Sequence, residues 1–333
     1  MSSYQRELEV GLEAVRRAAR VCRSVQTGIG PDAIDKQDSS PVTIADFASQ
    51  AIICRALKLA FPEDPIVGEE DSAELKDASG EHHLPRIQRE LEAVGDPADP
   101  ESIYESIDFG SAKEYSPRFW TLDPIDGTKG FLRGEQYAIS LALVIEGELQ
   151  LGILGCPNLD VESNDISETG TLLYAIKGQG AFRLRLDDPA AEPIPIRVSP
   201  ISDPAQTRLC ESVESGHSSH SDSARLAEML GLAGTPRRLD SQAKYAIVAS
   251  GEAELYLRLP TRPGYREKIW DHGGGVLIAL EAGGRVTDAL GQPLDFSQGY
   301  CLENNRGVIV SNGPLHESVL EGLEQLGIRE KAQ

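Results

Sequence analysis

The stretch that most constrains the fold is residues 119–131, FWTLDPIDGTKGF, in which a strand pattern runs directly into turn-forming and acidic residues. The alternation at 119–122 predicts a strand that enters a hydrophobic core. Pro124 favours an extended conformation at Asp123 and has no N–H to donate, so we expect the strand to end at Asp123. Asp126 follows three residues later. Two carboxylates in one loop repel each other unless a proton or a cation lies between them.

The oxygen-rich loop after this strand suits a hard cation such as Mg²⁺ better than zinc. Gly127 permits close approach of the backbone, and Thr128 brings a hydroxyl beside backbone N–H groups. A cation, a hydroxyl and N–H groups together suit a phosphate. An ordinary turn is the alternative, because Asp, Pro and Gly are common turn formers. Acidic residues elsewhere in the chain are therefore needed to distinguish a phosphate site from an ordinary turn.

Composition and charge limit the class of protein and its partners. The chain has 333 residues, of which 40% are hydrophobic, and its net charge is -21. This length suits one large domain or two closely packed ones with a substantial core. The acidic surface argues against nucleic acid or an anionic membrane as a partner. A phosphorylated substrate would need a site where metal ions reverse the local field.

The cysteines and the chain start predict a cytoplasmic protein, with nuclear import as the alternative. Five cysteines are scattered along the sequence without a C-x-x-C pair, which indicates buried thiols in a reducing compartment. The sequence has no apolar segment long enough to span a bilayer. The first twelve residues, MSSYQRELEVGL, lack the apolar centre of a secretory signal.

Hydrophobic periodicity predicts helices and strands that alternate along the chain, which indicates an α/β (α+β) protein built from layers. Helices are expected at 4–26, 43–60, 84–91, 223–230, 241–249, 270–282 and 315–326. Strands are expected at 66–67, 119–122, 138–145, 149–154, 171–176, 181–186, 209–213, 255–259, 286–288 and 308–312. The Pro-rich connector 187–204 separates two halves, 1–190 and 200–333. The polar segment 72–117 is expected to be a peripheral insertion or lid.

Acidic residues recur where a strand ends or a helix begins. Glu69 follows the short strand at 66–67, whereas Asp46 and Asp271 stand where helices are expected to start. Each has a structural alternative: Asp46 forms a capping box with Thr43, and Asp271 is an N-cap. Spacing along the chain does not show that these carboxylates meet in space.

Three of these segments resemble the motifs of a phosphatase superfamily. Gly68-Glu69-Glu70, the DPIDGT sequence at 123–128 and Trp270-Asp271 are similar to those of the inositol monophosphatase superfamily of Mg²⁺-dependent, lithium-sensitive phosphatases. Further stretches resemble its 3'(2'),5'-bisphosphate nucleotidase branch: 39–46, 212–220, 240–245, and 256–260 followed by 265–271. The resemblance covers nearly the whole chain. It implies a layered αβαβα sandwich with the site in a cleft between the two halves.

The resemblance also implies an activity. It is the Mg²⁺-dependent hydrolysis of the 3'(2')-phosphate of adenosine 3'(2'),5'-bisphosphate to AMP, and of its 5'-phosphosulfate relative to APS, in sulfur assimilation. A monomer is expected. One alternative is a phosphatase of the same superfamily that cleaves inositol phosphates. Another is a non-catalytic nucleotide sensor on the same scaffold.

The resemblance assigns roles to individual residues. The ligands of two or three Mg²⁺ ions would be Glu69, Asp123, Asp126, Asp271 and the carbonyl of Ile125. Asp46 with Thr128 would position and deprotonate the attacking water, and backbone N–H groups of Gly127 and Thr128 would hold the scissile phosphate. The nucleotide would be contacted by His217, Ser241, Lys244 and Arg258. His220 is the alternative to His217 in the HSSH sequence.

One departure from the family pattern follows Trp270-Asp271. The family usually has small alanines there, whereas this chain has the glycines 273–275. Glycine is a poor helix former, so we expect these residues to loosen the helical turn that presents Asp271.

Overall fold

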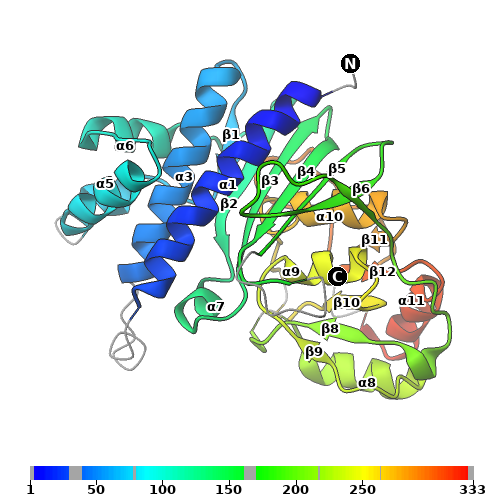
Figure 1. Cartoon of the computed structure of the whole chain (residues 1–333). Helices are drawn as coiled ribbons and strands as arrows, with labels where there is room; N and C mark the ends of the chain where they lie inside the picture. Colours follow the sequence, from blue (N-terminus) through cyan, green and yellow to red (C-terminus); the bar gives the residue numbers. More distant parts are fainter. Residues whose placement is uncertain are drawn as a thin grey trace.

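The structure, a computed structural model, describes residues 4–29, 40–77, 80–160, 170–216, 218–262 and 264–328. In this part of the chain, helices and sheets alternate in five layers (Figure 1). The helices α1 (Gln5–Thr27) and α3 (Ser40–Ala60) cover one face of a seven-stranded sheet. The helices α9 (Ala243–Ala249) and α10 (Gly273–Glu281) lie between this sheet and a five-stranded sheet. The predicted layered α/β fold is confirmed.

The seven-stranded sheet has its strands in chain order, β1 to β7. Strands β1 and β2 are parallel, and each later neighbour is antiparallel. The sheet is covered by helices on both faces, which explains why its central strands are apolar without strict alternation. The strands are β1 (Ile66–Gly68), β2 (Arg118–Asp126), β3 (Ala138–Ile145), β4 (Glu148–Cys156), β5 (Thr171–Ile176), β6 (Ala181–Arg185) and β7 (Ile194–Ile196).

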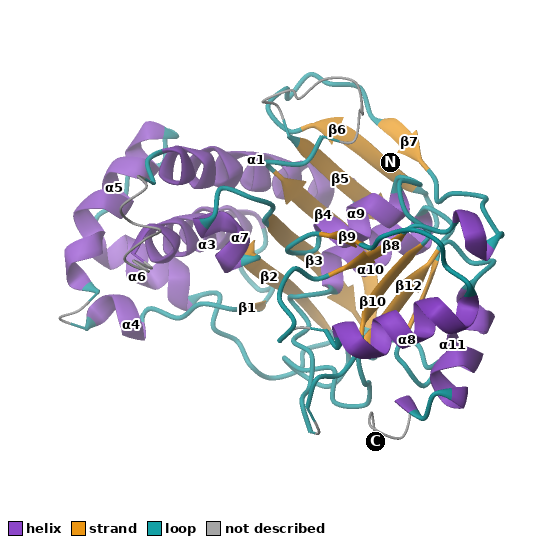
Figure 2. Ribbon diagram, turned by 90° about the horizontal axis from the view of Figure 1, so that it is seen from below, coloured by secondary structure: helices purple, strands orange, loops and turns teal. Residues whose placement is uncertain are grey.

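The five-stranded sheet has the order β11-β12-β10-β8-β9. Its outer face carries α8 (His220–Leu230) and α11 (His316–Gln325), which pack against each other (Figure 2). A short 3-10 turn, η2 (Pro204–Gln206), precedes this sheet. The strands are β8 (Leu209–Glu211), β9 (Arg237–Arg238), β10 (Leu255–Arg258), β11 (Arg285–Thr287) and β12 (Val308–Ser311).

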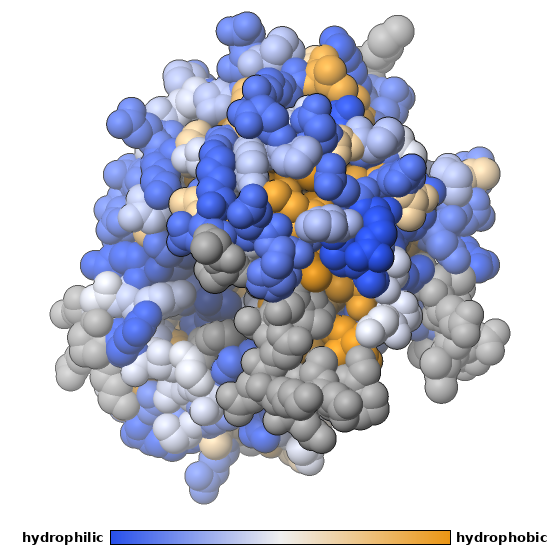
Figure 3. Space-filling model, turned by 90° about the vertical axis from the view of Figure 1, so that its left-hand side faces the viewer, coloured by the Kyte–Doolittle hydropathy of each residue, from blue (hydrophilic) through white to orange (hydrophobic). Residues whose placement is uncertain are grey.

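The segment between β1 and β2 forms short helices outside α3. They are α4 (Ala73–Lys76), η1 (Glu81–His83), α5 (Leu84–Ala93) and α6 (Pro100–Asp108). Ile87, Ile103 and Ile107 are fully buried and belong to the core beneath α1 and α3. These helices of the segment 72–117 are therefore packed onto the first core through buried apolar side chains. Its outer face is mostly hydrophilic (Figure 3), as expected of a strongly acidic protein.

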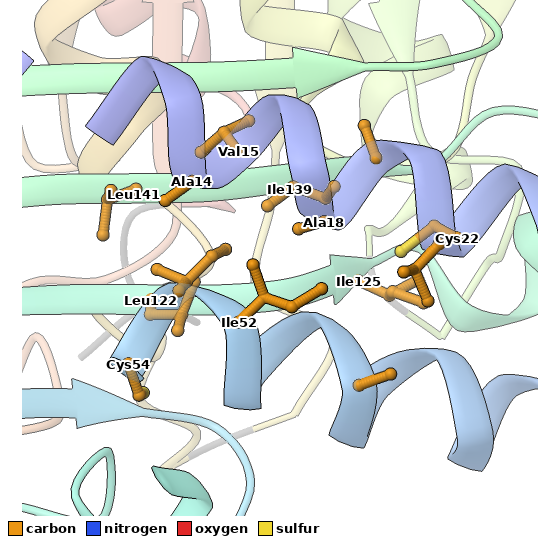
Figure 4. Close-up of a cluster of buried hydrophobic side chains, with 14 of the residues drawn as sticks. Ala14, Val15, Ala18, Cys22, Ile52, Cys54, Leu122, Ile125, Ile139 and Leu141 are labelled. Atoms are coloured by element: carbon orange, nitrogen blue, oxygen red, sulfur yellow. The ribbon is translucent and has the colours of Figure 1, made fainter. Parts of the chain in front are cut away.

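Three hydrophobic cores fill the spaces between the layers. The first lies between α1, α3 and the seven-stranded sheet, where Ala14, Ala18 and Cys22 of α1 face side chains of β2, β3 and α3 (Figure 4). The second surrounds α9 and α10, and the third lies beneath α8 and α11. All five cysteines are buried and unpaired, as their scatter in the sequence predicts. Within the described residues, no helix has both the length and the apolar character that a membrane crossing requires.

The strand β2 extends beyond the point where the sequence predicts its end. It continues through Pro124 to Asp126, and its pairing with β3 shifts register between Asp123 and Asp126. A β-bulge tolerates a proline because one residue there is unpaired and needs no ladder hydrogen bond. The expectation that the strand stops at Asp123 is therefore wrong. The bulge carries both aspartates instead of a separate loop.

The expected capping box at Thr43 and Asp46 is also wrong. The helix α3 already includes Ser40, so Asp46 lies in its second turn. Pro41 suits the first turn of a helix, where its missing N–H removes no hydrogen bond. Asp46 is consequently available for a contact outside its own helix.

The three glycines at the start of α10 pack closely rather than loosening the helix. A Cβ on Gly273 would lie 2.9 Å from Thr121 Cγ2, and one on Gly274 would lie 2.8 Å from the carbonyl oxygen of Ile153. A Cβ on Gly275 would overlap the ring of Tyr245 in α9. The expectation of a loose turn is wrong, because the sheet and α9 hold this turn in place. Only residues without a side chain allow α10 to approach both.

We expect Gly275→Ala to lower the free energy of unfolding by about 1–3 kcal/mol, because overpacking outweighs the better helix propensity of alanine. The Tyr245 ring is fully buried and cannot move into solvent. Urea denaturation would measure the loss. Gly234→Ala is the control, because its Cβ would meet only the Thr207 carbonyl oxygen at 3.6 Å. Equal effects of the two substitutions would contradict the packing explanation.

Candidate active site

The parallel pairing of β1 with β2 brings Glu69 beside Asp123. Gly68 is in register with Leu122, and the Glu69 N–H donates to the Leu122 carbonyl oxygen at 3.2 Å. Both acidic residues thus follow paired positions at the same edge of the sheet.

The helix α3 adds Asp46 to this edge. Ser49, three residues later on the same helical face, donates from its hydroxyl to the Pro124 carbonyl oxygen at 3.0 Å. Asp46 is buried. Its pKa is raised well above the ordinary value, first by burial and then by the negative charges of Glu70 and Glu69.

The second half of the chain contributes contacts from the segments before α9 and α10. The Gln242 N–H donates to Asp126 Oδ2 at 2.5 Å. Burial and the negative charge of Asp271 raise the pKa of Asp126 to about 6, although the positive charges of Lys244 and Arg258 act in the opposite direction. The two halves of the chain therefore meet at these carboxylates.

The donor set at this meeting point fits a hard cation. Asp123 is 1% exposed, and its Oδ1 atom has no hydrogen-bond partner. Burial, followed by the charges of Glu69 and Asp126, raises the pKa of Asp123. The pKa of Glu69 is also raised by desolvation and by Asp271, although the exposed surface of Glu69 weakens this effect. Crowded carboxylate oxygens without a cationic partner are the ligands that Mg²⁺ prefers.

A tighter cluster lies beside these carboxylates but is an ion-pair network. Glu267, Asp271 and His272 are, among the described residues, the trio whose donor atoms lie within 4.8 Å of one another. Arg258 Nη2 lies 2.7 Å from Glu267 and 3.2 Å from Asp271. Burial alone would raise the pKa of Glu267, but Arg258 and His272 lower it to about 2. Arg258 thus supplies the positive charge that this trio requires.

The segment before α9 lies against the DPIDGT sequence. A Cβ on Gly127 would lie 3.0 Å from that of Ser241, and Ser241 has a left-handed backbone with φ of 67°. Lys244 Nζ donates to the carbonyl oxygens of Ser241, at 2.6 Å, and Leu239, at 3.0 Å. Burial lowers the pKa of Lys244 to about 8, although the charge of Asp126 opposes this effect. Lys244 therefore supports the strained turn at Ser241.

The remaining residues predicted for the site differ in their exposure to solvent. Thr128 is exposed and is the first residue of α7 (Thr128–Leu132). The Ile125 side chain is buried in the first core, which leaves only its backbone for the site (Figure 4). His217 lies outside the described residues. His220 begins α8, and its Nε2 atom is hydrogen-bonded to the Ser212 carbonyl oxygen at 2.8 Å.

Ion pairs connect α7 to the second half of the chain. Arg133 Nη2 lies 2.5 Å from Asp240, and its Nη1 lies 3.0 Å from Glu214. Lys129 Nζ lies 2.8 Å from the same Glu214. Glu214 and Asp240 belong to two of the stretches that resemble the nucleotidase branch. These contacts hold those stretches against the end of β2.

Sequence reasoning assigned no role to three residues that the structure places at the site. Glu70 lies near Asp46, and burial raises its pKa to about 7 with help from Glu74 and Asp71. Gln242 contacts Asp126, and Glu267 holds Arg258. A polar glutamine before the apolar run 245–249 was the available signal for Gln242. Glu267 lies in a stretch that resembles the nucleotidase branch, which was the available signal for it.

Comparison with known proteins identifies the family. The model of the inositol monophosphatase family matches residues 4–327. The chain belongs to this family. A solved structure of the family fold, the IMPase of Thermotoga maritima, is 20% identical with a TM-score of 0.65 and covers 99% of this chain and 100% of that one. Mycobacterium tuberculosis SuhB is 20% identical with a TM-score of 0.62, covering 98% of both chains.

Curated relatives within the inositol monophosphatase family carry a narrower name, 3'(2'),5'-bisphosphate nucleotidase. One from Candida albicans is 43% identical and covers 97% of this chain and 98% of its own. One from Schizosaccharomyces pombe is 42% identical, with coverage of 96% and 95%. One from Oryza sativa is 41% identical, with coverage of 99% and 96%.

The raised carboxyl pKa values predict how stability depends on pH. A raised pKa gives stability that is present below the ordinary value near 4 and is lost as pH rises through the folded value. We therefore expect the thermal midpoint in EDTA to fall from about pH 6.5 to about pH 8.5 and Mg²⁺ to restore it, because ionised carboxylates bind the cation. Differential scanning calorimetry would measure both effects.

Glu70→Gln should make this pH dependence shallower, because it removes a carboxyl with a pKa of about 7. The chosen range avoids His316, whose pKa is lowered to about 4 by burial and Arg285. A buried neutral histidine makes the protein less stable only as pH falls below the ordinary histidine pKa of about 6.5. A midpoint in EDTA that rises with pH would contradict the carboxyl assignment.

Proposed function

We propose that this chain is a Mg²⁺-dependent 3'(2'),5'-bisphosphate nucleotidase, a phosphoric monoester hydrolase. It would convert adenosine 3'(2'),5'-bisphosphate to AMP and phosphate, and the 5'-phosphosulfate relative to APS. The observation that carries the proposal is the cluster of Glu69, Asp123, Asp126 and Asp271, with Lys244 and Arg258 beside it. Support also comes from the full-length similarity to proteins named 3'(2'),5'-bisphosphate nucleotidase.

The acidic residues would hold two or three Mg²⁺ ions, together with the carbonyl of Ile125. When bound, Mg²⁺ neutralises phosphate charge, acidifies a water and stabilises the leaving oxygen. The carboxylates of the chain keep the cations at the edge of the sheet. The fold contributes their position, because Glu69 and Asp123 are fixed by strand register and Asp126 by the Gln242 N–H.

Asp46 and Thr128 would act on the attacking water. A carboxylate with a raised pKa is a better proton acceptor than an ordinary one, and the pKa of Asp46 is raised. Thr128 presents an exposed hydroxyl at the start of α7. The first N–H groups of a helix have no acceptor within that helix. Those of Gly127 and Thr128 would therefore face the scissile phosphate.

The retained 5'-phosphate would be recognised by basic and polar residues of the second half. Arg258 carries a positive charge beside Asp271, so recognition of the nucleotide is connected to a metal ligand. Ser241 and Lys244 form the turn next to Gly127, and His217 would complete the contacts. We further propose a cytoplasmic monomer with the site between residues 1–190 and 200–333.

A substrate panel tests the proposed function. Purified protein with Mg²⁺ should release phosphate from adenosine 3',5'-bisphosphate with a higher kcat/KM than from inositol phosphates. Asp123→Asn should reduce kcat/KM for the bisphosphate at least about 100-fold. Removing only a hydrogen-bond partner of a metal ligand already lowers metal affinity or activity about 10–100-fold. The exposed Asp187→Asn is the control. Binding of the nucleotide without phosphate release would indicate a non-catalytic nucleotide sensor instead.

Arg258→Ala should lower kcat/KM for the bisphosphate by at least about tenfold more than for inositol 1-phosphate, because only the bisphosphate has a second anionic group. Arg258 also pairs with Asp271, so both rates are expected to fall. The ratio of the two kcat/KM values is therefore the informative measurement. An unchanged ratio would favour the inositol phosphatase alternative.

A further inference from the structure

Gln242 is a buried residue that contacts both halves of the candidate site. It is 1% exposed and directly precedes α9. Its main-chain N–H donates to Asp126 Oδ2 at 2.5 Å. The position of this backbone therefore fixes the orientation of the Asp126 carboxylate.

The side chain of Gln242 reaches the segment that carries Asp271. Its Nε2 atom donates to the Trp270 carbonyl oxygen at 2.9 Å. Its Oε1 atom accepts from the Gly275 N–H at 3.2 Å and from the Ser140 hydroxyl at 3.1 Å. The amide thus binds the chain on both sides of Asp271.

One of these contacts replaces the missing cap of α10. The N-cap residue is His272, which makes no capping hydrogen bond with its side chain. Its Nδ1 atom is hydrogen-bonded to the Tyr245 hydroxyl at 2.8 Å instead. First-turn N–H groups need an outside acceptor, usually from the N-cap side chain. Gln242 supplies that acceptor from another element, so the Asp271 carboxylate is not required as a cap.

We propose that Gln242 is a positioning residue that sets the separation between Asp126 and Asp271. Its main chain holds the first carboxylate, and its side chain caps the helix that follows the second. The inference deepens the proposed function, because it requires both aspartates to bind Mg²⁺. Groups that orient metal ligands typically change metal affinity by about 10–100-fold.

The test compares two substitutions of Gln242. Gln242→Met keeps the volume and removes the amide. Gln242→Asn keeps the amide but is one methylene shorter, so it cannot reach both Trp270 and Gly275. We expect the Mg²⁺ Kd of the substrate-free protein, measured by calorimetry, to rise about 10–100-fold in both variants. Amide hydrogen exchange of residues 271–276 in EDTA should also become faster, because the cap is lost.

Two control variants separate positioning from general destabilisation. Ser140→Ala removes one donor to Gln242 and leaves both contacts with the α10 segment in place. Leu323→Ala weakens the third core at α11, on the outer face of the five-stranded sheet. Both should bind Mg²⁺ within about twofold of the unsubstituted protein, a difference below 0.5 kcal/mol.

The outcomes decide between the proposals. Mg²⁺ affinity within twofold of the unsubstituted protein in the Gln242 variants would overturn the positioning role, as would an equal loss in Leu323→Ala. If Gln242→Met does not fold, Gln242→Asn decides alone. Mg²⁺ binding without hydrolysis of the bisphosphate by the unsubstituted protein would overturn the proposed function and leave the positioning role intact.

Discussion

Repulsion between carboxylates is the constraint on which the site depends. Glu69 and Asp123 follow paired positions of parallel strands, and Asp46 and Asp126 are held close by neighbouring contacts. Burial and the negative charges of their neighbours raise the pKa values of Glu69 and Asp123, which favours the protonated forms of both. Such an arrangement is stable only because the surrounding layers prevent the segments from separating. A bound cation would favour the ionised carboxylates instead.

Close packing of α10 is what brings the second half of the chain to these carboxylates. Glycines at 273–275 allow this helix to approach the seven-stranded sheet and α9 at the same time. Tyr245 occupies the space beside them and is hydrogen-bonded to His272. The position of Asp271 is thus decided by contacts of its neighbours on both sides. Packing in the second core therefore decides the geometry of the site at Asp271.

Acidic residues in the same region have opposite properties because their partners differ. Glu267 is buried beside Arg258, which lowers its pKa to about 2 and favours its ionised form. Asp123 is buried without a cationic partner, and its pKa is raised. The first is suited to orienting an arginine, and the second to the metal-ligand role proposed for it. Burial alone does not distinguish these roles, whereas the nearest opposite charge does.

The sequence by itself determined most of the helices and strands, the layered α/β class and the motifs that identify the family, but not short elements such as α7, β7 and β9. These features depend on local periodicity and on residues close together in the chain. The bulge that carries β2 through Pro124, the earlier start of α3 and the tight fit of the glycines at 273–275 depended on partners far away in sequence. The cap that Gln242 provides for α10 also comes from another element. Only the tertiary structure could decide them, because hydrogen-bond acceptors and packing space are supplied by whichever segments fold nearby.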